Sequence, residues 1–196
     1  MVANRATTET PASLTYSSFV SRDSARLAFL ITELNKLDAM TWDVGNAYLN
    51  TPCREKIWFV AGTEHGEKKG KVMVVVWALY GLESSGASWR AMSADTLLAM
   101  NFIPTQEYPD VYRRKSRKPY GEEYHQLLLI YVDDVMACSH DPQAIMDDLA
   151  LTYDLKEGSP TIYLGSEIKK YQVGNGKEHY SVSSTQYFKK IIKTYE

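Results

Sequence analysis

A pair of adjacent aspartates, Asp133 and Asp134, constrains the fold of this chain more than any other feature of its sequence. The pair stands between two short apolar runs, at residues 127–130 and 135–137. This pattern predicts two strands joined by a tight turn that carries both acids. Adjacent ionised carboxylates repel each other unless a cation lies between them, so an acidic turn between buried strands favours a divalent-metal site. The alternative is a turn whose acids are simply solvated.

A third aspartate, Asp43, also follows an apolar run, at residues 39–42, and precedes a Gly-Asn pair typical of a turn. Three carboxylates at strand ends are what a site for two Mg²⁺ ions requires, with Mn²⁺ as an alternative ion. Two such ions about 3.5–4 Å apart can activate an attacking 3′-hydroxyl and stabilise the leaving pyrophosphate. The sequence therefore predicts that Asp43 meets the acidic turn at a shared metal site, although Asp43 alone would indicate only a turn.

Four ordered sequence blocks resemble the reverse transcriptases of copia-type LTR retrotransposons. The blocks are residues 43–58, residues 78–89, Tyr-Val-Asp-Asp at 131–134 and Tyr-Leu-Gly-Ser-Glu-Ile at 163–168. They occur in the order that the family has, and the resemblance covers roughly residues 12–196. It implies the palm region of a Pol polyprotein, an RNA-directed DNA polymerase that transfers nucleotides onto a primer 3′-hydroxyl.

Residues 21–196 are predicted to form one α+β unit in which an antiparallel sheet packs on helices, after a polar, partly disordered segment at residues 1–20. The expected order of the central elements is strand, helix, strand, strand, helix, strand. This split-βαβ, or ferredoxin-like, order places the ends of the first and third strands side by side, so that Asp43 lies next to Asp133 and Asp134. The resemblance identifies this unit as the polymerase palm.

Two segments are predicted to be buried. A helix beginning near Ser21 or Asp23 is expected to turn an apolar face toward the core. That face consists of Leu27, Leu30, Ile31, Leu34 and Leu37. The β-branched segment at residues 72–77 is expected to be a buried strand. Residues 161–171 and 178–183 are expected to pair as a hairpin.

The resemblance implies that the three acids are catalytic. Asp43 and Asp133 are expected to ligate the metal ions, together with the carbonyl of Val44. Asp134 either ligates a metal or orients its neighbour. The implied nucleotide-binding residues are Tyr48, Tyr80, Gly81 and Lys156.

These four residues have different implied roles. Tyr48 would collide with a 2′-hydroxyl and favour deoxynucleotides, and Gly81 would allow the backbone to approach the nucleotide. Lys156 would lie near the triphosphate. A core position for Tyr48, strand-end packing for Tyr80 and a solvated surface for Lys156 are the alternatives.

Primer and template contacts are implied at two segments of the chain and at Tyr131. One segment resembles the hairpin that grips the primer end, and the other is a basic run suited to phosphate contacts. The residues are Tyr163, Leu164 and Gly165 in the first segment and Arg113, Arg114 and Lys115 in the second. A plain hydrophobic hairpin and a solvated basic face are the alternatives.

Two departures from the family pattern bear on activity. The chain has Glu83-Ser84-Ser85-Gly86 where many relatives have Lys-Gln-Ser-Pro. Full-length relatives also carry finger strands before this region and an RNase H domain after it. The expectation is therefore a fragment with the fingers largely missing and RNase H absent, and with weak or no activity alone. Its expected partners are an RNA or DNA template with primer, deoxynucleoside triphosphates, and the rest of Pol, which comprises fingers, RNase H and integrase.

Composition excludes several other classes of protein. The chain of 196 residues has a net charge of −2 and two cysteines, too few for a disulfide framework. No apolar run is long enough to span a membrane, so no membrane partner is expected. An intracellular location is expected, and the resemblance implies a cytoplasmic virus-like particle and also the nucleus. Two alternative functions stay open: an inactive remnant that binds nucleic acid or protein, and an unrelated metal-dependent phosphotransferase.

Overall fold

The computed structural model describes residues 3–5, 20–157, 162–164, 166–174 and 177–195. The chain divides into two compact units, which we describe separately. The first comprises Met1–Ser17 and Asn46–Thr96, and the second comprises Ser18–Gly45 and Leu97–Glu196. The aspartates at 43, 133 and 134 all belong to the second unit.

The first unit contains a small antiparallel sheet with the strand order β1-β3-β4. Its strands are β1 (Ala3–Arg5), β3 (Ile57–Val60) and β4 (Val72–Val74), and its short 3₁₀ helices are η1 (Ala47–Asn50) and η2 (Thr63–Lys68). Helix α3 (Ser85–Ala99) begins in this unit. The prediction that residues 72–77 are buried was wrong, because Val72, Val74 and Val76 are exposed.

The second unit contains a six-stranded antiparallel sheet with the order β5-β6-β7-β8-β2-β9. The strands are β2 (Asp38–Val44), β5 (Ile103–Pro104), β6 (Val111–Arg117), β7 (Glu123–Tyr131), β8 (Asp134–Ser139) and β9 (Leu155–Glu157). The predicted α+β class, with antiparallel sheets and helices, is confirmed.

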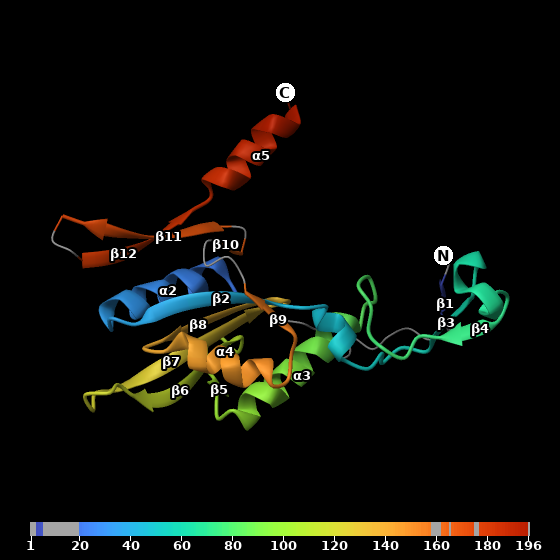
Figure 1. The fold of residues 1–196 in the computed structure, drawn as a ribbon, viewed down its shortest axis with the longest axis horizontal. Helices are drawn as coiled ribbons and strands as arrows, with labels where there is room; N and C mark the ends of the chain where they lie inside the picture. The colour runs from blue at the N-terminus through green and yellow to red at the C-terminus, as the bar shows by residue number, and fades with distance from the viewer. Residues whose placement is uncertain (1–2, 6–19, 158–161, 165, 175–176, 196) are drawn as a thin grey trace. The chain divides into compact units, whose positions relative to one another are not determined.

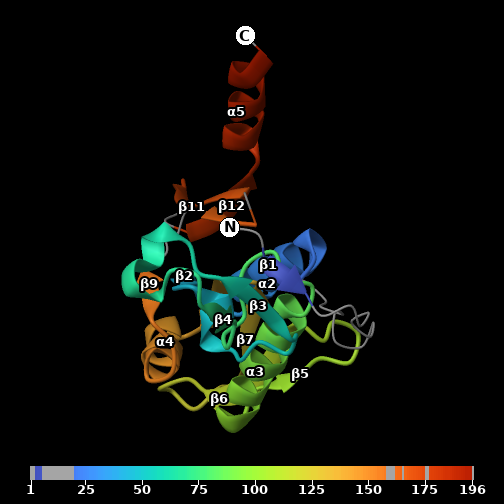
Figure 2. The same ribbon diagram turned by 90° about the vertical axis from the view of Figure 1, so that its right-hand side faces the viewer.

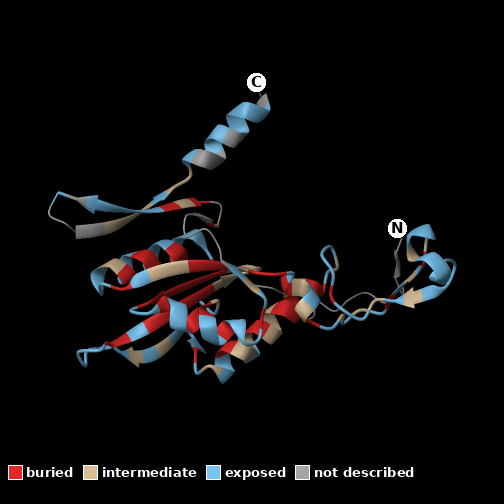
Figure 3. Cartoon of the chain, in the orientation of Figure 1, coloured by how far each residue is buried: buried red, intermediate tan, exposed pale blue. Residues whose placement is uncertain are grey.

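Two helices cover the central strands from opposite sides (Figure 1). Both α2 (Arg22–Leu34) and α4 (Pro142–Ala150) contact β2 and β8. Because side chains alternate along a strand, Met136 and Cys138 of β8 join the cluster beneath α2, whereas Val135 and Ala137 face the other side. Strand β8 is thus buried on both faces, as Figure 3 shows in red. This explains why its sequence is a continuous apolar run.

Polar side chains cap α2 and α4, and the start of α2 at Ser21 matches the sequence prediction. The Ser21 side chain accepts a hydrogen bond from the backbone N–H of Ser24 and caps α2. Asp141 accepts one from Ala144 and caps α4, whose first residue is Pro142.

The predicted apolar face of α2 was wrong. Four of its members, Leu27, Leu30, Ile31 and Leu34, are between 40% and 73% exposed, and only Leu37, which lies beyond the helix, is buried. The residues that α2 buries are Ser24, Ala25, Ala28, Phe29 and Thr32. Because most of these side chains are small, the helix backbone can approach the sheet closely. The face of small residues, and not the leucine-rich face, therefore packs on the sheet.

A second, three-stranded antiparallel sheet follows in the chain, with the order β10-β11-β12. Its strands are β10 (Ile162–Tyr163), β11 (Ser166–Val173) and β12 (Lys177–Ser183). The predicted hairpin is confirmed by the pairing of β11 with β12. Strand β12 contacts α2, and helix α5 (Thr185–Tyr195) continues beyond β12 (Figure 2). No helix in the described ranges is long and apolar enough to cross a membrane.

The two cysteines differ in environment, which leads to a labelling prediction. Burial raises the pKa of the Cys138 thiol to about 11, although a hydrogen bond with Thr32 acts in the opposite direction. Cys53 is partly exposed. We expect a thiol reagent at pH 8 to modify only Cys53 rapidly in the folded chain, and both cysteines in denaturant. The reason is that the reactive species is the thiolate, which burial disfavours at Cys138. Mass spectrometry of the labelled peptides checks this, and rapid native labelling of Cys138 would contradict the described packing.

Candidate functional site at the tip of the central hairpin

The turn between β7 and β8 is tight and strained. Tyr131 and Asp134 pair across the two strands, which leaves Val132 and Asp133 as the connection. Val132 has φ 54°, a left-handed value that a β-branched residue rarely adopts. Such an outlier costs about 1–3 kcal/mol and is found disproportionately at functional sites. The backbone N–H of Val44 donates a 2.7 Å hydrogen bond to the carbonyl of Asp133, which ties the turn to the end of β2.

The strand register brings three ionisable residues and a tyrosine into one row. Tyr131 pairs with Asp134, Asp134 with Asp43, and Asp43 with Lys156 of β9. Side chains of directly paired residues share a face of the sheet, with Cβ atoms about 4.5–5.5 Å apart. Asp43 and Asp134 are therefore neighbours on the same face, with Asp133 in the adjoining turn and Lys156 on the far side of Asp43.

Electrostatic effects confirm that the acids interact. Burial raises the pKa of Asp134 to about 6, and the charges of Asp133 and Asp43 act in the same direction. The pKa of Asp43 is also raised, first by burial and then by Asp133, while Lys156 lowers it. Negative charge is thus concentrated at the tip. Among the causes of these two pKa shifts, only the charge of Lys156 acts in the opposite direction. A bound cation would relieve this repulsion.

The donor chemistry of the tip suits a hard divalent cation, because it consists of carboxylate oxygens and backbone carbonyls. In the ranges that the structure describes, no group of three or more His, Cys, Asp and Glu side chains is arranged to hold a metal ion. The acids that the register brings together would therefore have to reorient to share an ion. Val44, whose carbonyl was predicted as a further ligand, is buried and pairs with Leu155 of β9.

Comparison with known proteins decides the family. The model of the family described as "Reverse transcriptase (RNA-dependent DNA polymerase)" matches residues 7–196. The chain belongs to the reverse transcriptase family. It is 26% identical over 150 residues to the "Retrovirus-related Pol polyprotein from transposon TNT 1-94" of Nicotiana tabacum. That match covers 74% of this chain and 11% of the tobacco protein, so the chain spans about a tenth of this relative. The resemblance to copia-type reverse transcriptases is confirmed.

The reverse transcriptase tip includes one residue that the sequence prediction missed. The N–H of Gly45 donates a 2.7 Å hydrogen bond to the carbonyl of Asp154, next to β9. A Cβ at position 45 would lie 3.1 Å from that carbonyl oxygen and 3.0 Å from Oδ2 of Asp154. A glycine directly after a strand, as here after β2, indicates such a close backbone approach.

Gly45→Ala is therefore expected to destabilise the chain by about 1–3 kcal/mol, because the new methyl group would overpack against a backbone atom. Gly174→Ala is the control, since a Cβ at position 174 has no atom of the described residues within 4 Å. Urea unfolding of both variants checks the prediction. Equal stability of Gly45→Ala and wild type would show that β9 can move away from β2.

The residues implied for nucleotide binding lie in both units. Lys156 is exposed beside Asp43 in the second unit. The rings of Tyr48 and Tyr80 lie in the first unit, 4.5 Å apart between centroids and tilted by 43°. Gly81, in the same unit, has φ 93°, which favours glycine.

The residues implied for gripping the primer are less accessible. The side chain of Tyr163 is buried against α2, and Leu164 is half-buried with φ 52°. Gly165 lies outside the described residues. Tyr131 is half-buried and packs against the cluster beneath α2.

The basic run on β6 divides into exposed and internally bonded side chains. Arg114 donates hydrogen bonds to the side chain of Gln126 and the carbonyl of Met100, and its guanidinium lies 4.4 Å from the centre of the Phe102 ring. Arg113 and Lys115 are exposed. Arg114 is thus engaged in the fold, whereas its two neighbours face solvent.

The exposed basic residues lie away from the acidic tip. Arg113 pairs with Leu127 and Lys115 pairs with His125, which are four and six residues along β7 from Tyr131. At about 3.3 Å per residue, this places them about 13–20 Å from the tip. An open hollow of about 300 Å³ is lined by Arg113, Lys115 and His125 among others. The hollow offers positive charge to an anionic ligand.

Proposed function

We propose that the second unit is the palm of an RNA-directed DNA polymerase and that it transfers deoxynucleotides onto a primer 3′-hydroxyl. The observation that carries the proposal is the pairing of Asp43 with Asp134 at a shared sheet face, with Asp133 in the turn between β7 and β8. Two divalent ions, when bound, would activate the hydroxyl and stabilise the leaving pyrophosphate.

The sheet order supports the palm assignment. Along the chain, the second unit has β2, β7, β8, α4 and β9 in this order, and α3, which begins in the first unit, lies between β2 and β7 in the sequence. In space these four strands lie in the order β7-β8-β2-β9, all antiparallel. That arrangement fits the split-βαβ, ferredoxin-like unit.

The proposed roles follow from position and charge. Asp43 and Asp133 hold the metal ions, the Val44 carbonyl adds an oxygen ligand, and Asp134 either ligates or orients. Lys156 lies beside Asp43 and offsets negative charge from an incoming triphosphate. In such chemistry the protein contributes mainly positioning and charge neutralisation.

Substrate contacts complete the proposal. Tyr48 disfavours a 2′-hydroxyl, Gly81 admits close backbone approach, and Tyr80 packs on Tyr48. Segment 163–165 contacts the primer end, where Leu164 is the accessible side chain because Tyr163 is buried. The exposed Arg113 and Lys115 contact template–primer phosphates. Template, primer, deoxynucleotides and the remainder of Pol are the proposed partners, inside a virus-like particle.

Primer extension tests this function. With an oligo(dT) primer on poly(rA) and Mg²⁺ or Mn²⁺, we expect short products from dTTP and far less from UTP. We expect this activity to be weak for the chain alone. Binding of template–primer without any incorporation would contradict the enzyme and favour the non-catalytic remnant. Processive synthesis would contradict the weak-activity part alone, and hydrolysis without incorporation would indicate another phosphotransferase.

A further inference from the structure

The hydroxyl of Tyr163 is a buried hydrogen-bond donor for which the fold supplies no acceptor among the described residues. Tyr163 is only 2% exposed, and its hydroxyl has no hydrogen-bond partner among the described residues. Native structures rarely leave a buried hydroxyl unpaired, because its desolvation is then uncompensated. Phenylalanine would fill the same space without that cost, so the hydroxyl calls for a role.

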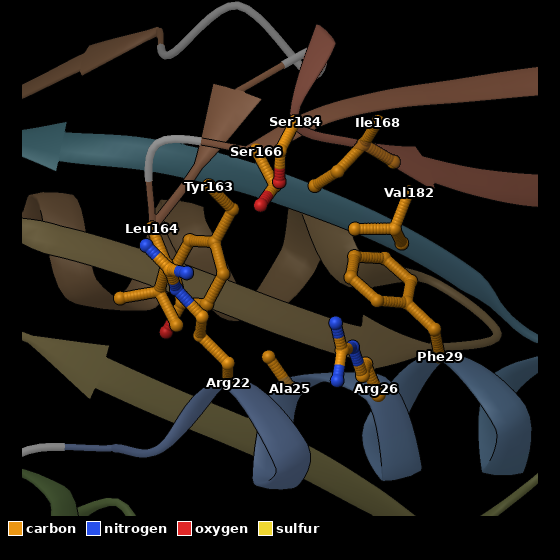
Figure 4. A pocket seen from close by; sticks show the side chains of 10 residues that line it. All are labelled: Arg22, Ala25, Arg26, Phe29, Tyr163, Leu164, Ser166, Ile168, Val182 and Ser184. Carbon is orange, nitrogen blue, oxygen red and sulfur yellow. The ribbon is translucent and has the colours of Figure 1, made fainter. Parts of the chain in front are cut away.

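The position of Tyr163 relates it to the acidic tip. Figure 4 shows its side chain reaching from β10 toward α2, beside a hollow of about 20 Å³ that it lines with Ala25 and Leu164. Its ring belongs to the cluster that includes Leu129 and Met136. Met136 and Asp134 are two residues apart on β8 and therefore point to the same face of the sheet.

Asp134 is the charged group that acts most strongly on this hydroxyl. Burial raises the pKa of Tyr163 well above its usual value, and the next largest cause is the charge of Asp134, ahead of Cys138 and Tyr131. A phenol hydroxyl donates to a carboxylate, which can only accept. Tyr163 therefore lies in the cluster on the sheet face that also carries Asp134, with a donor that no described group accepts from.

We propose that the Tyr163 hydroxyl is a positioning donor for Asp134, holding one carboxylate oxygen so that the other faces the metal ions. This inference rests on the proposed function. A carboxylate that reorients when a cation binds finds here a buried donor that no other described group occupies. Donors behind a metal ligand fix its orientation, and their loss typically lowers metal affinity by 10–100-fold.

A matched pair of tyrosines allows a clean test. The Tyr124 hydroxyl is also buried, but it is 3.0 Å from the Ser139 hydroxyl and accepts a hydrogen bond from the His140 N–H at 3.1 Å. Tyr124→Phe therefore removes a satisfied hydroxyl away from the acids. Tyr163→Phe removes an unsatisfied hydroxyl in the cluster on the sheet face that carries Asp134.

The experiment measures unfolding without metal and Mn²⁺ binding by calorimetry for both variants. We expect Tyr163→Phe to be at least as stable as wild type without metal but to bind Mn²⁺ about tenfold more weakly. Tyr124→Phe should be less stable and bind Mn²⁺ as wild type does. In an Asp134→Asn background, Tyr163→Phe should have no further effect on Mn²⁺ binding, because the two act as a unit.

Three outcomes would overturn the proposal. Unchanged Mn²⁺ affinity in Tyr163→Phe would show that the hydroxyl does not position Asp134, while leaving the proposed function intact. Destabilisation of metal-free Tyr163→Phe to the same degree as Tyr124→Phe would assign the hydroxyl a structural partner. No saturable Mn²⁺ binding by wild type would remove the proposed function together with this inference.

Discussion

Asp133→Asn is expected to lower nucleotide incorporation by about 10³-fold or more, because it removes a negative charge from the position where the metal ions would be held. Asparagine has nearly the same shape as aspartate and also suits a turn. The carbonyl of residue 133, which accepts a hydrogen bond from Val44, is unchanged by the substitution. The fold and the binding of template–primer should therefore survive.

The measurement is primer extension alongside template–primer binding by fluorescence anisotropy. Asp148→Asn is a suitable control, since Asp148 is exposed on α4 and the substitution changes the net charge equally. Incorporation by Asp133→Asn at the wild-type rate would exclude a catalytic role for the turn. A parallel loss of binding would mean that the acid acts on the fold or on nucleic acid.

Asp134→Asn is expected to stabilise the metal-free chain at neutral pH while impairing activity. The pKa of Asp134 is raised to about 6 in the folded chain, first by burial and then by Asp133 and Asp43, from an ordinary value of 3.8. Between these two pH values the folded state binds more protons than the unfolded state, so wild-type stability falls as pH rises. The loss is complete above about pH 6 and absent below about pH 4.

The stability difference between Asp134→Asn and wild type isolates this effect. For a half-buried carboxylate screened by solvent, we expect the variant to be more stable by about 1–2 kcal/mol at pH 7.5. The difference should shrink as pH falls through 6 and vanish near 4. Mg²⁺ should stabilise wild type more than the variant, by mass action. Urea unfolding across this pH range checks all three expectations. A stability difference that grows at low pH would mean that folding lowers the pKa of Asp134 instead of raising it.

The acidic tip was predictable because its determinants are local in the sequence. Largely apolar runs before Asp43 and on either side of Asp133 and Asp134 indicate strands whose ends carry the acids. The order of strands and helices then predicts that Asp43 lies next to the acidic turn. The register that sets Asp43 directly opposite Asp134 comes from the structure.

The faces of the elements were not predictable in the same way. Periodicity shows that α2 has an apolar stripe, but it does not say whether that stripe or the face of smaller residues meets the sheet. Likewise, the basic run gives no sign that Arg114 bonds to Gln126 while Arg113 stays exposed, because those partners come from a separate strand and from the α3–β5 connection. Close approaches such as Gly45 to Asp154 depend on atoms 109 residues apart and become visible only in three dimensions.

The double covering of β8 has a consequence for how the proposed metal site would discriminate among ions. A strand packed on both faces, with its turn tied to β2, cannot shift its backbone to fit a larger or smaller cation. Any adjustment would then come from the rotamers of a few carboxylates and from the groups that hydrogen-bond to them. In the proposed metal site, ionic radius would then be sensed by side-chain torsions, so remote core substitutions that tilt β8 would change metal preference without touching a ligand.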